Sequence, residues 1–212
     1  MPQQILPSTR ILLIAMMVAA CAAPVQKQEY TGFLSDYSNL QEKDSMTFLF
    51  HSDDLLNYRS FIIDPIEILY VPDEDNRIFS DEELAELQTF FKTNLSDALT
   101  RDNQYAVVSE PGPSVARMRY AITHIDDTIG VLNIAMYTKI TGAGLGGVAI
   151  EGELVDSQSG EQLAATVRWG SGSRVPLVGR AGFTHTGDAK ILLARWSKRL
   201  RQRLDQLHED PD

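Results

Sequence analysis

Apolar and polar residues alternate with a period of two in three segments, which is the pattern of half-buried β-strands. These segments are 115–125 (VARMRYAITHI), 148–156 (VAIEGELVD) and 161–169 (EQLAATVRW). The turn residues SQSG between the last two predict a β-hairpin. Segments 61–71 and 105–110 are rich in β-branched and aromatic residues and predict two more strands.

Apolar residues recur at every third or fourth position in two other segments, which predicts two amphipathic helices. The first covers about 81–101, where Ser80 and Glu83 have the spacing of a capping box. The second has Thr186 or Asp188 as its N-cap. One face of this second helix is apolar: Leu192, Trp196, Leu200, Leu204 and Leu207.

The order of these elements, β-α-β-β-(β)-β-β-α, predicts an α+β fold with a single mixed, mostly antiparallel sheet and two amphipathic helices packed on one face. Residues 132–141 are ambiguous and are the strand in brackets. Pro65 lacks an N–H donor, so its strand should be at an edge or pair only after the proline. The domain is expected at 61–209, and an irregular N-terminal arm at 31–60 should pack on its core through four side chains: Phe33, Leu34, Tyr37 and Leu40.

The first 21 residues have the order of a secretory signal peptide. Arg10 precedes a ten-residue apolar run at 11–20, which is half of the about 20 residues that a membrane-spanning helix needs. A buried apolar helix is the alternative, but nothing before the run could pack with it. The end of the run resembles the bacterial lipobox, which often has Leu in place of the valine found here: Val18, Ala19, Ala20 and Cys21.

The lipobox resemblance implies cleavage of a signal peptide at 1–20 and acylation of Cys21, the only cysteine in the chain. The thiolate is the nucleophile that takes the lipid. Lipoproteins of this kind carry three acyl chains, palmitate among them, and more than one chain anchors a protein firmly. Residues 21–30 would then be a flexible tether. Ala22, in place of Asp, implies export to the outer membrane, where the domain faces the periplasm.

The mature chain would carry 18 Lys and Arg against 29 Asp and Glu, a net charge of −11. An acidic protein is a poor general binder of nucleic acid, so no nucleic-acid partner is expected. The charge is uneven, because residues 190–203 hold six Lys and Arg and no acid. These cations could bind anionic lipid or an acidic partner. We favour the other interpretation, in which they complement the helix macrodipole and face the acidic first half of the chain.

Candidate metal and nucleotide motifs are weak. His51 and His124 are each followed by two aspartates, a pattern that a polar turn and a solvated strand end also explain, so no metal site is expected. The run at 73–76 lacks the Gly and Glu of a calcium loop. Residues Gly142–Gly147 match GxGxxG but precede a strand instead of a helix. A flexible loop or a close approach of backbones is expected there, with contact to a membrane or partner as the alternative.

No catalytic residue and no cofactor is predicted. A GxSxG motif is absent, and the lone cysteine is consumed by lipidation. A hydrolase would require His124 or His185 to face a Ser and an Asp across the fold.

Three segments together resemble a family of bacterial lipoproteins known only as a domain of unknown function: TGFLSDYSNL (31–40), IDPIEIL (63–69) and IEGELVDSQSGEQLAA (150–165). The resemblance covers about 31–207 and implies an envelope lipoprotein, with no catalytic residues to assign. The first hypothesis is therefore a non-enzymatic module that binds another envelope protein or a cell-wall component. The alternative is a carrier of a small ligand or lipid, with an apolar cavity near Trp169 and Trp196.

Overall fold

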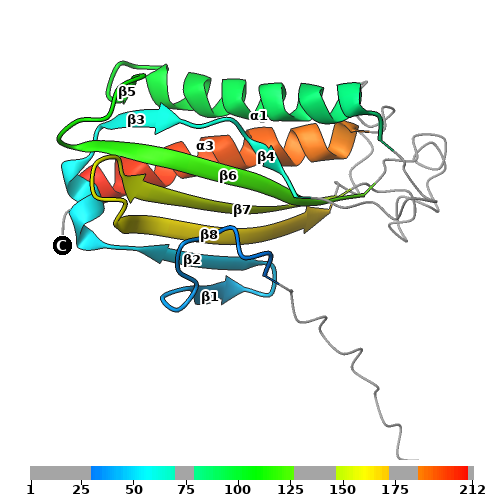
Figure 1. The fold of residues 1–212 in the computed structure, drawn as a ribbon, viewed down its shortest axis with the longest axis horizontal. Coiled ribbons are helices and arrows are strands. Elements are labelled where there is room, and N and C mark those ends of the chain that lie inside the picture. Colours follow the sequence, from blue (N-terminus) through cyan, green and yellow to red (C-terminus); the bar gives the residue numbers. More distant parts are fainter. Residues whose placement is uncertain (1–29, 70–78, 127–146, 172–185, 210–212) are drawn as a thin grey trace, which may run out of the picture.

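The computed structural model of the chain describes residues 30–69, 79–126, 147–171 and 186–209. Figure 1 shows one sheet with both helices on the same face. The helices are α1 (Asp81–Thr100) and α3 (Gly187–Glu209), and a short 3-10 helix covers Asp53–Asn57. The strands are β1 (Gln41–Asp44), β2 (Thr47–His51), β3 (Ser60–Ile63), β4 (Glu67–Ile68), β5 (Ala106–Val107), β6 (Val115–Asp126), β7 (Gly147–Asp156) and β8 (Gln162–Ser171).

The strand order in the sheet is β1-β2-β8-β7-β6-β3-β5, and β4 pairs with β6 beside β3. The strands from β1 to β6 along this order are antiparallel, whereas β3 runs parallel to both β5 and β6. The unit β3-α1-β5 is thus a parallel crossover. The predicted α+β fold, with a mixed, mostly antiparallel sheet and two helices on one face, is confirmed.

Helix α1 begins where its cap predicts. The Ser80 side chain accepts a hydrogen bond from the Glu83 amide at 3.2 Å, and the Glu83 carboxylate accepts one from the Ser80 amide at 2.9 Å. These two bonds satisfy donors that a helix N-terminus otherwise leaves unpaired. The stripe that faces the core is fully buried: Leu87, Phe91, Leu95 and Leu99.

The two faces of the sheet carry two separate apolar clusters. Alternate residues of β6 and β7, such as Met118, Ile122 and Ile150, point to the helices and form the main core. The opposite face is covered by the N-terminal arm, whose Phe33 and Leu34 pack on Val167 and its neighbours. The sheet is therefore buried on both faces, and the predicted packing of the arm is confirmed.

The expectation of an irregular arm over 31–60 is wrong for its second half. Residues 41–51 form the hairpin β1–β2, and β2 pairs with β8 over its whole length. The hairpin was not predicted because all four residues of β1 are exposed and β2 shows no alternation of apolar and polar residues. For Pro65, pairing does not begin only after the proline, because β3 pairs with β6 before it and β4 pairs with β6 after it. The edge alternative agrees with the structure, since β5 reaches only Ser60 and Phe61 and β4 pairs with β6 alone.

Candidate functional site

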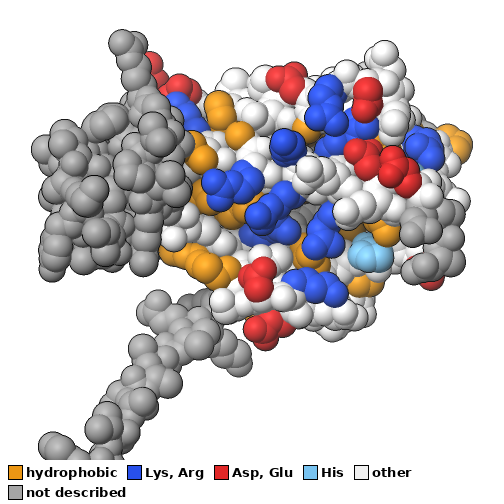
Figure 2. Space-filling model, turned by 180° about the vertical axis from the view of Figure 1, so that it is seen from behind, with side chains coloured by type: hydrophobic (Ala, Val, Ile, Leu, Met, Phe, Trp, Pro, Cys, Tyr) orange, Lys and Arg blue, Asp and Glu red, His pale blue; other side chains and the backbone are white. Residues whose placement is uncertain are grey.

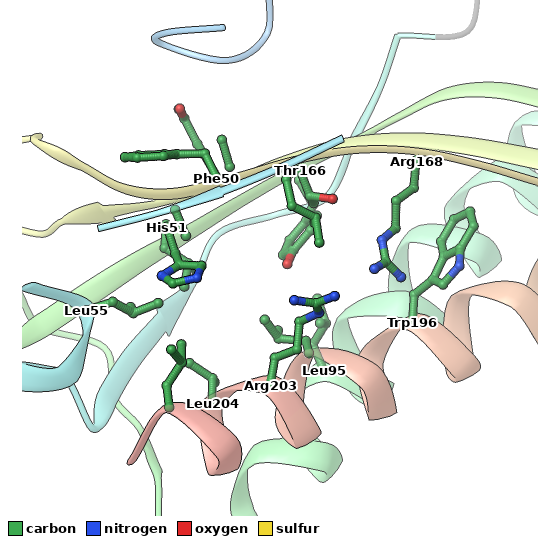
Figure 3. Close-up of a pocket in the computed structure, with 18 of the residues that line it drawn as sticks. Phe50, His51, Leu55, Leu95, Thr166, Arg168, Trp196, Arg203 and Leu204 are labelled. Carbon is green, nitrogen blue, oxygen red and sulfur yellow. The ribbon is translucent and has the colours of Figure 1, made fainter. Parts of the chain in front are cut away.

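A groove of about 520 Å³ opens between the sheet and α3 (Figure 3). Helix α3 contacts β7 and β8, while β2 continues the sheet beyond β8 and forms the outer wall. The walls are mainly apolar, and much of the lining comes from leucine side chains and Trp196: Leu49, Leu55, Leu95, Leu154, Trp196 and Leu204. The volume lies within the range of about 300–1,000 Å³ that is usual for small-molecule sites.

Two arginines extend into this groove from opposite walls. Figure 3 shows the guanidinium of Arg168 reaching down from β8 beside Trp196, and that of Arg203 reaching up from α3. Arg168 is buried, with 8% of its surface exposed, whereas Arg203 is exposed at the mouth. Burial, and then the positive charges of Arg199 and Arg203, lower the pKa of Arg168 from its usual value. The two arginines make this part of the groove positively charged, while Glu153 and Glu209 also contribute to its lining.

The floor of the groove depends on a close contact between Tyr120 and Gly152. These residues are paired across β6 and β7, and a Cβ atom at Gly152 would lie only 2.1 Å from Cε1 of the tyrosine. Glycine is thus required for the ring to lie flat on the sheet. Burial raises the pKa of Tyr120 to about 12, so the ring remains neutral at physiological pH.

The face that carries the helices also holds the basic residues of α3. Figure 2 shows Lys and Arg side chains gathered over this face, with hydrophobic side chains visible between them. Arg201 is buried and binds Asp102 at 2.7 Å and Asp205 at 2.6 Å, and Lys190 binds Glu86 at 2.7 Å. The prediction that cations of α3 face acids of the first half is therefore confirmed for Arg201 and Lys190.

The remaining cations of α3 take part in no ion pair among the described residues. Arg195, Lys198 and Arg199 are exposed, and Arg203 lines the groove. Internal neutralisation therefore accounts for only part of the basic cluster.

The histidines are dispersed. His51 lines the groove, His208 contacts Tyr105 near the end of α3, and the ring of His124 packs on Trp169 at 4.6 Å. Within the described ranges, no three His, Cys, Asp or Glu side chains come close enough to hold a metal ion.

Trp169 directly follows Arg168 on β8, so its side chain points to the opposite face of the sheet, away from the groove. Of the two tryptophans expected near a cavity, only Trp196 lines it.

Several predicted sites lie outside the described residues. They include the lipobox with Cys21, the acidic run at 73–76, the ambiguous segment at 132–141, His185, and the glycine loop up to residue 146. The last glycine of that loop, Gly147, is the first residue of β7.

Arg168, Tyr120 and Gly152 were not identified from the sequence as site residues. No signal in the sequence singles out Arg168. In the alternating segment EQLAATVRW it shares the more polar face with Thr166, and only the structure shows that this face is turned to α3.

In the part of the chain that the structure describes, no helix combines the length and apolarity needed to cross a membrane.

Comparison with known proteins places the chain among bacterial lipoproteins. The "Uncharacterized lipoprotein YdcL" of Escherichia coli K12 is 26% identical over 176 residues, with 74% of this chain and 78% of that protein covered. This relative supports the interpretation of the chain as an envelope lipoprotein.

Solved structures with similar elements share little sequence. A PelC dodecamer from Paraburkholderia phytofirmans is 11% identical and covers 76% of this chain and 94% of its own, with a TM-score of 0.42. Lipoprotein GNA1162 from Neisseria meningitidis is 14% identical and covers 67% and 96%, with a TM-score of 0.32. The sequence itself is decisive: the model of the family "Protein of unknown function (DUF3313)" matches residues 29–200, and the chain belongs to that family.

Proposed function

We propose that this protein is a non-enzymatic lipoprotein that binds a small apolar ligand in the groove between β8 and α3. It would be anchored through lipidated Cys21 in the outer membrane, with its domain facing the periplasm. The observation that carries the proposal is the groove itself, which is concave, largely apolar and of the size that small ligands occupy. A protein or cell-wall partner on the outer surface is the competing function.

The chemistry of the lining favours binding over catalysis. His51 is the histidine that lines the groove, and the hydroxyl of Thr166 donates its hydrogen bond to the carbonyl of Phe48. A hydroxyl held in this way is not paired with a base, which nucleophilic catalysis would require.

Crosslinking in intact cells tests the ligand. A photoreactive benzoylphenylalanine in place of Leu49, in the full-length chain, places the reactive group at the wall of the groove. The matched control replaces Glu42, which is exposed on β1. We expect an adduct below about 1 kDa at position 49 and none at position 42. If position 49 instead gives only adducts of protein size, the partner-binding function replaces this one.

The anchor is tested separately by Cys21→Ser. Because the serine oxygen cannot replace the thiolate, we expect loss of labelling by radioactive palmitate and accumulation of the uncleaved precursor. Unchanged palmitate labelling and unchanged retention in the outer-membrane fraction would refute lipidation at this residue.

A further inference from the structure

The groove combines a long apolar part with a cationic part, and this combination defines a chemical class of ligand. In Figure 3, Leu55 and Leu204 lie at one end, while Arg168 and Trp196 lie at the other. Arg203 reaches into the space between the walls. His51 lies beside Leu55, and Gln206 and Glu209 also line the groove, but most of the lining is apolar. An occupant that fits the apolar lining and the two arginines is apolar along most of its length and negatively charged at one end.

Arg168 is the central element, because it is a buried cation for which the described residues supply no carboxylate. Among the described residues, no Asp or Glu oxygen lies within ion-pair distance of its guanidinium, and the positive charges of Arg199 and Arg203 act on it. Asp44 contributes only a weaker attraction. Burying a charged group costs desolvation free energy unless an opposite charge pairs with it. Arg168, Arg199 and Arg203 together therefore favour binding of an anion.

The same chain shows how it treats a buried arginine that has a structural role. Arg201, two residues from Arg203 on α3, binds two carboxylates and donates to the carbonyls of Ala98 and Leu99 at 3.2 and 3.0 Å. Arg168 has no such set of partners among the described residues. This contrast indicates that the guanidinium of Arg168 is available to a bound anionic group.

The volume of the groove limits the size of the apolar part. At about 30 Å³ for each water in the liquid, 520 Å³ corresponds to about 17 water molecules. A methylene group is close to water in volume, so the groove matches one acyl chain of about 12–16 carbons together with a small head group. Two such chains would need about twice this volume.

We propose that the groove binds a single long-chain fatty acid, with its carboxylate at Arg168 and Arg203 and its chain along the leucines towards Leu55 and Leu204. A planar carboxylate can accept two parallel hydrogen bonds from one guanidinium, and the geometry suits a monoanion of this shape. The inference rests on the proposed function of the groove and names the ligand class for it.

Photolabelling of membranes that contain the full-length protein tests the inference. The probes are a hexadecanoic acid with a diazirine near the end of its chain, the alcohol of the same length, and the corresponding alkyl phosphate. Crosslinked peptides are mapped by mass spectrometry, so that labelling of β2 and α3 is separated from labelling elsewhere. We expect the acid to label these groove peptides at least about tenfold more than the alcohol and more than the phosphate.

The variants assign this preference to the two arginines. Arg168→Gln and Arg203→Gln should each reduce the preference for the acid to within about threefold, while labelling by the alcohol stays unchanged. Arg168→Lys keeps the charge and should retain part of the preference. The control is Arg195→Gln, which removes an exposed cation of α3 outside the groove and should leave labelling as in the wild type. Arg203 is exposed, so its variant folds even if loss of Arg168 disturbs the core.

The possible failures are distinguishable. If acid and alcohol label the groove equally and the arginine variants change nothing, the proposed apolar site stands and the fatty-acid inference is refuted. If the phosphate is preferred, the head group is wrong and the inference is likewise refuted. If none of the probes labels the groove, both the inference and the proposed function are refuted.

Discussion

Replacing Glu151 by Ala should release the N-terminal arm from the sheet. The Glu151 carboxylate is 1% exposed and accepts hydrogen bonds from the backbone amide and the hydroxyl of Thr31, both at 2.9 Å, and from the hydroxyl of Tyr37. These bonds hold the first described residues of the chain, directly after the predicted tether. Glu151 therefore holds the start of the N-terminal arm on the sheet, next to the predicted tether.

The structure sets the size of the effect. A hydrogen bond to a charged group contributes about 1.5–3 kcal/mol, but the three donors regain water once the arm lifts, so their contributions do not add. Lifting would also expose part of Phe33 and Leu34, which contribute about 1.5–3 kcal/mol each when fully buried. Neighbouring hydrogen bonds that Ser35 donates to the Glu153 carboxylate limit the movement. We expect a net loss of about 2–4 kcal/mol in the free energy of unfolding.

Two measurements check this expectation. A loss of about 3 kcal/mol should lower Tm by about 6–12 °C in a domain of this size. Hydrogen exchange should become faster at the Thr31 amide, and less so at the Ser35 amide, which Glu153 still holds. The control Glu161→Ala removes an exposed acid from the same hairpin. The reasoning fails if Glu151→Ala and the control unfold at the same temperature with unchanged exchange at Thr31.

Three further changes probe other parts of the fold. Ser80→Ala removes the capping box of α1 and should lower the free energy of unfolding, measured with denaturant, by about 0.5–2 kcal/mol. An unchanged free energy of unfolding would mean that the cap does not stabilise the fold. Gly152→Ala forces its Cβ against the Tyr120 ring and should lower the free energy of unfolding by about 1–3 kcal/mol. The Tyr120 resonances should also shift in NMR spectra. Hydrogen bonds from Ser159, first from its backbone and then from its side chain, lower the pKa of Asp156 from 3.8 to about 2. Because this folded-state pKa lies below the unfolded value, the stabilisation is complete above about pH 4 and is lost as the pH falls towards 2. Asp156→Asn should remove that part of the acid dependence, and an NMR titration that finds a pKa near 3.8 in the wild type would contradict it.

The elements with a regular pattern could be predicted from the sequence. The spacing of Leu87, Phe91 and Leu95 and the cap at Ser80 predicted a helix at about 81–101, and α1 covers 81–100. The hairpin of β7 and β8 followed from alternation on both sides of a short turn. These features depend on residues only a few positions apart, so the local sequence contains the information that determines them.

The β1–β2 hairpin and the groove could not be predicted in the same way. Strand β2 pairs with β8, its Thr47 opposite Arg168, although the two segments are far apart in the chain. The walls of the groove come from β2, β7, β8 and α3, and Arg168 is identified as a candidate ligand for an anion only because α3 packs beside it. The candidate anchor at Cys21 shows the opposite case, since it depends on a contiguous motif alone.

The sequence by itself therefore determined the class of fold, its two helices and its regular strands, because periodicity and caps act over a few residues. Only the tertiary structure decided which side chains meet across the sheet, which charges are paired and which remain facing a cavity. Those outcomes depend on long-range strand pairing and helix packing. The segments in contact are far apart in the chain, so a pattern within one segment does not indicate its partner.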